Sequence, residues 1–327
     1  MVVPTIKSAA AVMLIFSAAL FSCQKETSPD VIKNEQAASS LKAYNGDVND
    51  SKQERKVLFV SNRDGNDEIY SMNDDGTNIA RLTFNALPDG RATWSSNGQH
   101  IAFASGTVGD RDIFIMNANG KGLRNITNTP GKDEDWPEWS PKGNNVVFSS
   151  NMDGNHEIYL YDADDESLTR LTTRTQDDKW PTFSPDGSRI AFQSNLGSSS
   201  TLTDVFVMNA DGTNITQLTN SIAFDQMPTW SPDGTKIAFM SARDLNPEIY
   251  VMNSDGSGQT RLTNNTGIID ARPSWSKETD RIAFTSTRAF SLPAALIKYD
   301  IYVMNGDGSN VVRLTNNSIY DDYPFIK

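Results

Sequence analysis

The stretch PTWSPDGTKIAFMSARDLNPEIYVMNSDGSGQTRLT, residues 228–263, contains four short runs of strand-forming residues separated by turn sequences. Pro232-Asp233-Gly234 follows the first run, and proline and glycine at these places are typical of a tight turn. Residues 236–241 and 248–253 are rich in β-branched and aromatic residues, which favours strands. A second turn signal, Asp255-Gly256, precedes the last run, residues 260–263. We therefore expect four antiparallel strands, called a, b, c and d in chain order.

The same unit recurs along most of the chain. One phenylalanine in strand b marks each copy, and successive copies lie 44 to 47 residues apart: Phe59, Phe103, Phe148, Phe192, Phe239 and Phe284. A period of this length with four short strands is typical of propeller blades. The predicted fold class is therefore all-β, a six-bladed β-propeller with four-stranded antiparallel blades.

The two ends of the repeat region are complementary. The first copy begins at strand b, Val57 to Ser61, and the last residues, 323–327, have the pattern of a strand a with no strand b after it. We expect residues 323–327 to join the first blade and close the ring, which leaves no long unpaired strand edge.

The repeat resembles that of the TolB-like propeller family, in which Pro-x-Trp-Ser-Pro-Asp-Gly leads into Ile-Ala-Phe, Ile-Tyr-Val-Met-Asn, Asp-Gly and Arg-Leu-Thr. Examples here are residues 228–234, 237–239, 301–305, 307–308 and 313–315, and the resemblance covers residues 57–327. It implies the fold but leaves the function open, because one scaffold carries many roles. The family's namesake has an α/β domain before its propeller, where we expect only a tether, so its role in the Tol–Pal envelope system does not simply transfer.

The N-terminal residues are typical of a bacterial lipoprotein. Lys7 precedes an apolar run, residues 8–20, that is too short to span a bilayer but fits a secretory signal. Leu20-Phe21-Ser22-Cys23 resembles a lipobox, and Cys23 is the single cysteine. We predict a signal peptide over residues 1–22, a lipidated Cys23 with a disordered polar tether over residues 23–55, and the propeller over residues 56–327. The alternative is an ordinary signal peptide with a chance cysteine.

The net charge and a short motif after Cys23 indicate which partners and which location to expect. The formal net charge is -12, which disfavours nucleic acid and anionic lipid as partners. Gln24-Lys25-Glu26 resembles the signal that sends lipoproteins to the cell surface in the Bacteroidetes. We expect a monomer in the cell envelope, an outer-membrane lipoprotein that faces the periplasm or the cell surface and touches the membrane through its lipid anchor alone.

Acidic residues occupy two positions in every blade. Three residues before the proline position of strand a stand Asp89, Glu134, Asp178, Asp225, Asp270 and Asp321, called here the channel-mouth acidic ring. At the start of strand c stand Glu68, Asp112, Glu157, Asp204, Glu248 and Asp300, called the strand-c acidic ring. Either each carboxylate caps its own turn by accepting backbone N–H bonds, or the channel-mouth ring gathers a cation such as Ca²⁺ or a basic peptide segment.

Variable residues stand beside the channel-mouth acidic ring. The position before the proline holds Arg91, Trp136, Trp180, Met227, Arg272 and Tyr323, of types frequent in binding hot spots. The b–c loop of the last blade, residues 287–299, is long and carries Phe290, Leu292 and Leu296. Both sets are candidate partner or ligand contacts, and the alternative for both is packing against the propeller itself.

Other repeated residues are expected to form the core between blades. These are Trp94, Trp139, Trp230 and Trp275, together with Met72, Met116, Met208, Met252 and Met304. Function should reside on the face with the varied b–c and d–a loops, whereas the tight a–b and c–d turns should leave the other face nearly featureless.

Signals of catalysis are missing from the sequence. There are two histidines, His100 and His156, and no Gly-x-Ser-x-Gly elbow, His-Glu-x-x-His motif or phosphate-binding loop. We therefore expect a non-catalytic envelope lipoprotein without a cofactor, whose propeller binds an envelope protein or a basic peptide segment. The alternatives are a module that binds a carbohydrate, another small ligand or a cation at the channel mouth, and a metal-dependent lyase.

The lipobox gives a first testable prediction. Cys23→Ser should abolish labelling by a fatty-acid analogue and leave a soluble or unprocessed protein, because the acylated cysteine is the expected membrane anchor. Labelling is measured in separated membrane and soluble fractions. A Cys23→Ser protein that still takes up the label and stays with membranes would show that the anchor lies elsewhere.

Overall fold

The computed structural model describes residues 56–195, 202–288, 298–316 and 320–327. The chain divides into two units, Met1–Glu54 and Arg55–Lys327. The predicted signal peptide, Cys23 and the tether lie outside the described residues, as do Phe290, Leu292 and Leu296. Within the described ranges the regular structure consists of six four-stranded sheets. No helix in this part of the chain is long and apolar enough to cross a membrane.

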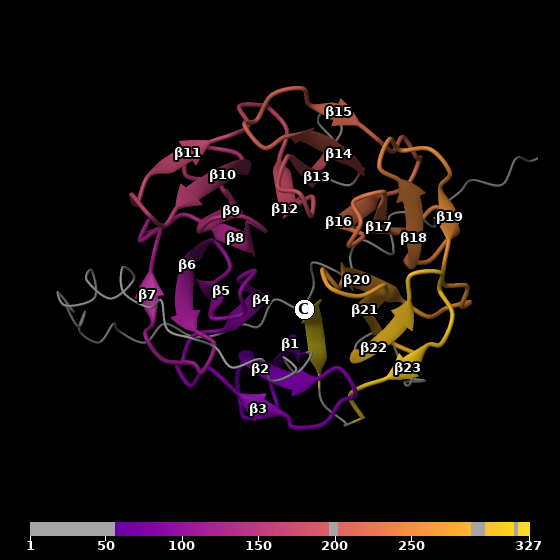
Figure 1. Cartoon of the computed structure of the whole chain (residues 1–327), viewed down its shortest axis with the longest axis horizontal. Helices are drawn as coiled ribbons and strands as arrows, with labels where there is room; N and C mark the ends of the chain where they lie inside the picture. Colours follow the sequence, from indigo (N-terminus) through magenta and orange to yellow (C-terminus); the bar gives the residue numbers. More distant parts are fainter. Residues whose placement is uncertain (1–55, 196–201, 289–297, 317–319) are drawn as a thin grey trace, which may run out of the picture. The chain divides into compact units, whose positions relative to one another are not determined.

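The six sheets follow one another around a ring, with strand a innermost and strand d at the rim (Figure 1). Strand a comprises β24 (Asp321–Ile326), β4 (Asp89–Trp94), β8 (Glu134–Trp139), β12 (Asp178–Phe183), β16 (Asp225–Trp230) and β20 (Asp270–Trp275). Strand b comprises β1 (Lys56–Ser61), β5 (His100–Thr107), β9 (Asn145–Ser150), β13 (Arg189–Asn195), β17 (Lys236–Ser241) and β21 (Arg281–Ser286). Strand c comprises β2 (Glu68–Asn73), β6 (Asp110–Asn117), β10 (Glu157–Asp162), β14 (Thr203–Asn209), β18 (Glu248–Asn253) and β22 (Asp300–Asn305). Strand d comprises β3 (Ala80–Arg81), β7 (Arg124–Asn125), β11 (Leu168–Arg170), β15 (Thr216–Gln217), β19 (Thr260–Arg261) and β23 (Val312–Arg313). Blades are numbered one to six in this order.

The six-bladed antiparallel propeller predicted from the sequence is confirmed, with two differences in strand bounds. Strand a begins at the acidic residue, for example Asp225, so the channel-mouth acidic ring lies within the sheets instead of in the preceding loops. Strand d is shorter than expected. In blade five the hydroxyl of Thr263 accepts the Ile249 N–H at 2.9 Å, so a side-chain oxygen takes the place of a backbone carbonyl at the end of the ladder.

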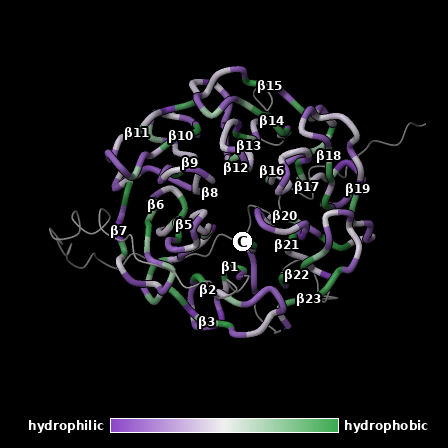
Figure 2. The backbone as a smooth tube through the Cα atoms, viewed as in Figure 1, coloured by the Kyte–Doolittle hydropathy of each residue, from purple (hydrophilic) through white to green (hydrophobic). Residues whose placement is uncertain are grey.

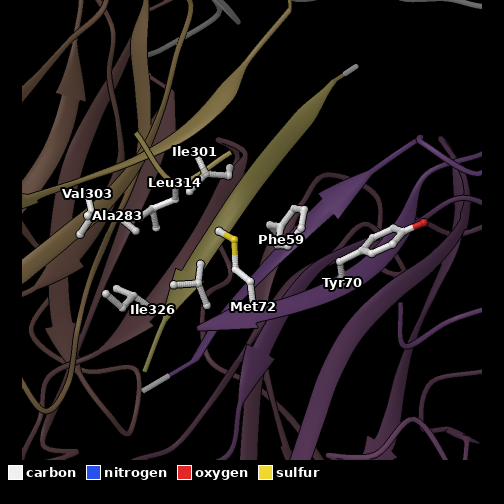
Figure 3. Packing of buried hydrophobic residues seen from close by; sticks show 9 residues of the cluster. Phe59, Tyr70, Met72, Ala283, Ile301, Val303, Leu314 and Ile326 are labelled. Atoms are coloured by element: carbon white, nitrogen blue, oxygen red, sulfur yellow. The ribbon is translucent and has the colours of Figure 1, made fainter. Parts of the chain in front are cut away.

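The C-terminal strand closes the ring, as predicted. β24 pairs with β1 in antiparallel register, with Val57 opposite Ile326 and Ser61 opposite Asp321. The Lys327 N–H donates to the Lys56 carbonyl at 3.1 Å. Ile326 is 1% exposed and belongs to a cluster that joins Phe59 and Met72 of blade one to Ala283, Ile301, Val303 and Leu314 of blade six (Figure 3).

The core lies between neighbouring blades. Figure 2 shows hydrophobic segments on the strands and many hydrophilic segments in the connections. The four tryptophans and five methionines predicted as core are all buried, the tryptophans between 0% and 8% exposed and each methionine 1% exposed. Trp230, for example, packs with Val205 and Val207 of blade four and with Phe239 of its own blade. Each blade thus buries its apolar surface against its neighbours and depends on them for its core.

Loss of the closing strand gives a second prediction. Removing residues 323–327 exposes the edge of β1 and the cluster around Ile326, so the melting temperature should fall by about 10 °C or more, or the protein should aggregate. Thermal unfolding followed by circular dichroism tests this. As a control, a variant that carries residues 321–327 joined by a short a–b turn in front of Lys56, and lacks them at the C-terminus, should regain the original melting temperature. An unchanged melting temperature after simple truncation would contradict closure through β24.

Candidate functional site

The two acidic rings form one row in each blade. In blade five Asp225 of strand a faces Ser241 of strand b, and Ser241 faces Glu248 of strand c. The other blades repeat this register through Ser61, Ser105, Ser150, Ser194 and Ser286. All members of the channel-mouth acidic ring are at most 1% exposed. The row therefore places carboxylates in the interior of each blade, where ionisation is costly without partners.

The strand-c acidic ring explains the Arg-Leu-Thr motif. Glu248 accepts a hydrogen bond from the Thr263 hydroxyl and pairs with Arg261 Nη2 at 2.7 Å. A threonine at the same place donates to the strand-c carboxylate in every blade: Thr83, Thr127, Thr172, Thr219, Thr263 and Thr315. These contacts tie the short strand d to strand c and give this ring a structural role.

The carboxylates of the channel-mouth acidic ring form hydrogen bonds and ion pairs mostly with side-chain donors. Arg63, Arg243 and Arg288 pair with Asp321, Asp225 and Asp270 at 2.9, 2.8 and 2.6 Å. Asp89 accepts from Asn85 Nδ2 at 2.6 Å. Glu134 accepts from the Ser150 hydroxyl at 2.7 Å and from the Thr129 hydroxyl. Asp178 lies 3.7 Å from Arg174 Nη1.

These contacts favour the structural alternative for the ring, although through side chains instead of the backbone donors expected from sequence. Binding of a cation or a basic segment by this ring stays a prediction. In the part of the chain that the structure describes, no group of three or more His, Cys, Asp or Glu side chains is arranged to hold a metal ion.

The variable residues before the proline position share an unusual backbone conformation. Each stands at a β-bulge in strand a, and Arg91, Trp136, Trp180, Met227, Arg272 and Tyr323 have φ angles between 49° and 58°. Left-handed backbone costs energy for residues other than glycine. Bulges re-aim side chains, and here the same bulge recurs six times around the axis.

Five of these residues line one hollow of the central channel: Arg91, Trp136, Trp180, Arg272 and Tyr323, called here the channel cluster. The hollow has a volume of about 80 Å³. The Trp136 and Trp180 rings stack with centroids 4.8 Å apart, and the Trp180 and Tyr323 centroids are 6.2 Å apart. The guanidinium groups of Arg91 and Arg272 lie 4.8 and 4.4 Å from the Tyr323 centroid. Met227, the sixth residue, is buried.

Two buried aspartates orient the arginines of the channel cluster. Asp135 pairs with Arg91 Nε and with Arg111 Nη1, both at 2.8 Å. Asp322 lies 3.1 Å from Arg272 Nη1 and accepts the Tyr320 hydroxyl. Both aspartates are fully buried. Sequence analysis missed them, although an acidic second residue of strand a is found only in blades one and three.

The last residue of the long b–c loop of blade six lies at the same site. This residue, Tyr299, lies with its ring centroid 5.2 Å from the Arg272 guanidinium and packs edge-on against Tyr320. The predicted contacts Phe290, Leu292 and Leu296 lie outside the described residues. Exposed apolar side chains also occur on other loops of this face, at Phe84, Leu87, Val108, Ile222 and Leu245, which sequence analysis did not single out.

The far end of the channel holds a second, larger hollow. It has a volume of about 190 Å³ and shares Glu138 and Phe325 with the first. Residues at and after the ends of strands a line it, among them Trp94, Trp139 and Lys277. The expectation of a nearly featureless a–b turn face was therefore wrong at the axis.

The buried carboxylates give a third prediction. Burial raises the pKa of Asp89 and of Asp178 to about 6 each. A raised pKa in the folded state contributes stability at low pH that is lost as the pH rises through about 6. Asp89→Asn and Asp178→Asn should therefore raise the free energy of unfolding at pH 7.5 by an amount on the order of 1 to 3 kcal/mol and flatten its fall between pH 4 and 7.

Urea unfolding across this pH range measures the effect. Asp321→Asn is the matched control, because it breaks a buried ion pair with Arg63 and should lower stability at pH 7.5. If all three substitutions lowered the free energy of unfolding equally, the ionised carboxylates of Asp89 and Asp178 would not be the source of a stability cost at pH 7.5.

Comparison with known proteins supports the same fold. The family model described as TolB beta propeller domain matches residues 93–202 and 181–292, together more than half of the chain. The Tol-Pal system protein TolB of Desulfosudis oleivorans is 39% identical over 62 residues, which are 19% of this chain and only 14% of that protein.

Two solved structures are similar over most of the propeller. TolB from Acinetobacter baumannii has a TM-score of 0.69 at 19% identity, over 83% of this chain and 66% of that chain. The putative TolB from Agrobacterium tumefaciens has a TM-score of 0.63 at 20% identity, over 80% of this chain and 88% of that chain. With the repeat motifs, the closed six-bladed ring and the family model in agreement, the chain belongs to the TolB β-propeller domain family.

Proposed function

We propose that the propeller is a non-catalytic protein-interaction module of the bacterial cell envelope, which binds a segment of a partner protein on the face with the b–c and d–a loops. The channel cluster carries the proposal. Its tryptophans, tyrosine and arginines are of the types that dominate binding hot spots. Buried ion pairs to Asp135 and Asp322 hold the arginines in place, so little side-chain entropy is lost when a partner docks.

The size of the first hollow favours a protein partner over a carbohydrate or another small ligand. Small-molecule pockets usually enclose about 300–1,000 Å³. The hollow at the channel cluster encloses about 80 Å³, so it accommodates little more than one side chain. A peptide segment that lies across the mouth needs no larger space, because most of it contacts the surrounding loops.

Those loops present apolar side chains to a partner. Phe84 and Leu87 lie in the d–a loop between blades one and two, and Ile222 lies in the loop between blades four and five. Their side chains are 73%, 50% and 94% exposed. Leu245, 85% exposed, also has a φ of 81°, a strained conformation for leucine. Burying such residues would supply apolar contact around the channel cluster.

The envelope location rests on sequence and relatives. The lipobox at Cys23 supports a lipid anchor in the outer membrane, and one relative is named a Tol-Pal system protein. The net charge of -12 favours encounter with a basic partner segment by long-range attraction. The aromatic and arginine groups of the channel cluster would then provide the short-range contacts.

Site-specific photo-crosslinking in cells tests the proposal and gives a fourth prediction. A photoreactive amino acid at Phe84 or Ile222 should yield a covalent adduct with one partner protein, whereas the same group at Thr235, exposed on the a–b turn face, should yield none. The double substitution Trp136→Ala with Trp180→Ala should reduce the adduct at least about tenfold, because it removes two hot-spot rings.

Melting temperatures measured alongside show whether the double variant keeps its fold. An adduct formed equally from Thr235, or an adduct yield unaffected in a folded double variant, would overturn the proposed surface.

A further inference from the structure

Three charged side chains stand at repeat positions that are neutral in the other blades. Glu138 is the fifth residue of its strand a, where the other blades have Thr93, Thr182, Thr229, Ser274 and Phe325. Lys327 occupies the place of Ser95, Ser140, Ser184, Ser231 and Ser276. Lys277 stands where other blades have Ser96, Pro141, Pro185 and Pro232. The blade fold does not require these charges, because the other blades form without them.

All three charges line the larger hollow at the a–b end of the channel. Glu138 Oε1 is well supplied with partners there: it lies 3.4 Å from Lys277 Nζ and accepts from the Thr182 hydroxyl and the Phe183 N–H, both at 3.1 Å. Among the described residues the counter-charge of Lys327 Nζ is the half-exposed Glu278, which also lines the hollow and lies 3.8 Å away. Burial accordingly lowers the pKa of Lys327.

Three donors on lining residues have no hydrogen-bond partner within the described part of the chain: Lys327 Nζ, Trp94 Nε1 and Trp139 Nε1. The three residues are 8%, 7% and 8% exposed. At the same repeat position Trp230 donates its indole N–H to the Thr182 carbonyl at 3.2 Å, and Trp275 donates to Asp280 at 3.1 Å. The tryptophans at this repeat position in blades five and six thus have acceptors, and the lack of one for Trp94 and Trp139 indicates an acceptor still to be bound.

We propose that this hollow binds a small carboxylate ligand with an apolar body. Indole N–H and ammonium groups donate and do not accept, so the missing group must be an acceptor. Lys277 already pairs with Glu138 and donates to the Phe183 carbonyl at 3.3 Å, so the charge of an anion would be met chiefly by Lys327. The indole rings of Trp94 and Trp139 and the ring of Phe325 offer apolar contact to the remainder of the ligand. An engineered cavity of about 150 Å³ holds benzene, so about 190 Å³ suits a molecule of the size of benzoate.

Indole N–H resonances test the proposal directly, because the chain has only six tryptophans. The full chain labelled with ¹⁵N in its tryptophans is titrated with sodium benzoate, and Trp94→Phe and Trp139→Phe assign the two signals. Both signals should shift downfield saturably, while the signal of Trp230, already hydrogen-bonded, should stay in place.

Matched ligands and variants test separately whether the charge and the apolar body of the ligand contribute to binding. Benzamide has the same body without the charge, and inorganic phosphate has the charge without the body, so both should bind at least about tenfold more weakly than benzoate. Lys327→Met should weaken benzoate binding to a similar degree, whereas Lys236→Met, at an exposed lysine, should not.

The proposal is overturned by the absence of a saturable shift in the unaltered chain, by equal binding of benzamide or phosphate, or by equal weakening in Lys236→Met. Because the hollow lies at the opposite end of the channel from the proposed partner surface, each proposal can fail without the other.

Discussion

The pairing of β24 with β1 is the constraint on which the rest of the molecule depends. A propeller blade has no core of its own, since its apolar residues pack against the blades on either side. An open ring would leave two blades with uncovered faces and one sheet with an unpaired edge. Four paired residues of each strand and the cluster around Ile326 close that gap. The channel and both hollows, which residues of several blades line together, exist only because the circle is complete.

Within the ring, most charged residues serve the framework. The row of carboxylate, serine and carboxylate crosses every blade, and in blade five threonine and arginine side chains from the end of strand d and the b–c loop bind its two carboxylates. A polar network whose members have partners fixes one register of the strands, whereas for Asp89 and Asp178, which keep unpaired oxygens in the described part of the chain, burial raises the pKa to about 6. This accounts for acidic residues that recur in all blades without forming a surface of negative charge at the channel mouth.

Residues that depart from the repeat mark the two ends of the channel. At one end the departures are aromatic residues and arginines at the strand-a bulges, held by Asp135 and Asp322. At the other end they are Glu138, Lys277 and Lys327 around a hollow with unpaired donors. The six similar blades form the scaffold. Residues that differ from blade to blade at one repeat position lie close together at the channel axis, so a change in one blade contacts residues of the others.

The sequence by itself determined the six blades, the closing strand and the tryptophan and methionine core, because the period, the turn residues and the alternation along the strands are local properties. It also placed Arg91, Trp136, Trp180, Arg272 and Tyr323 at one repeat position, which the structure brings together at the channel. Only the tertiary structure decided which charges are buried and paired. Arg63 meets Asp321 across 258 positions of sequence, and Lys277 meets Glu138 across three blades. Contacts of this kind follow from the curvature of the closed ring, and the residue pattern within one blade does not predict them.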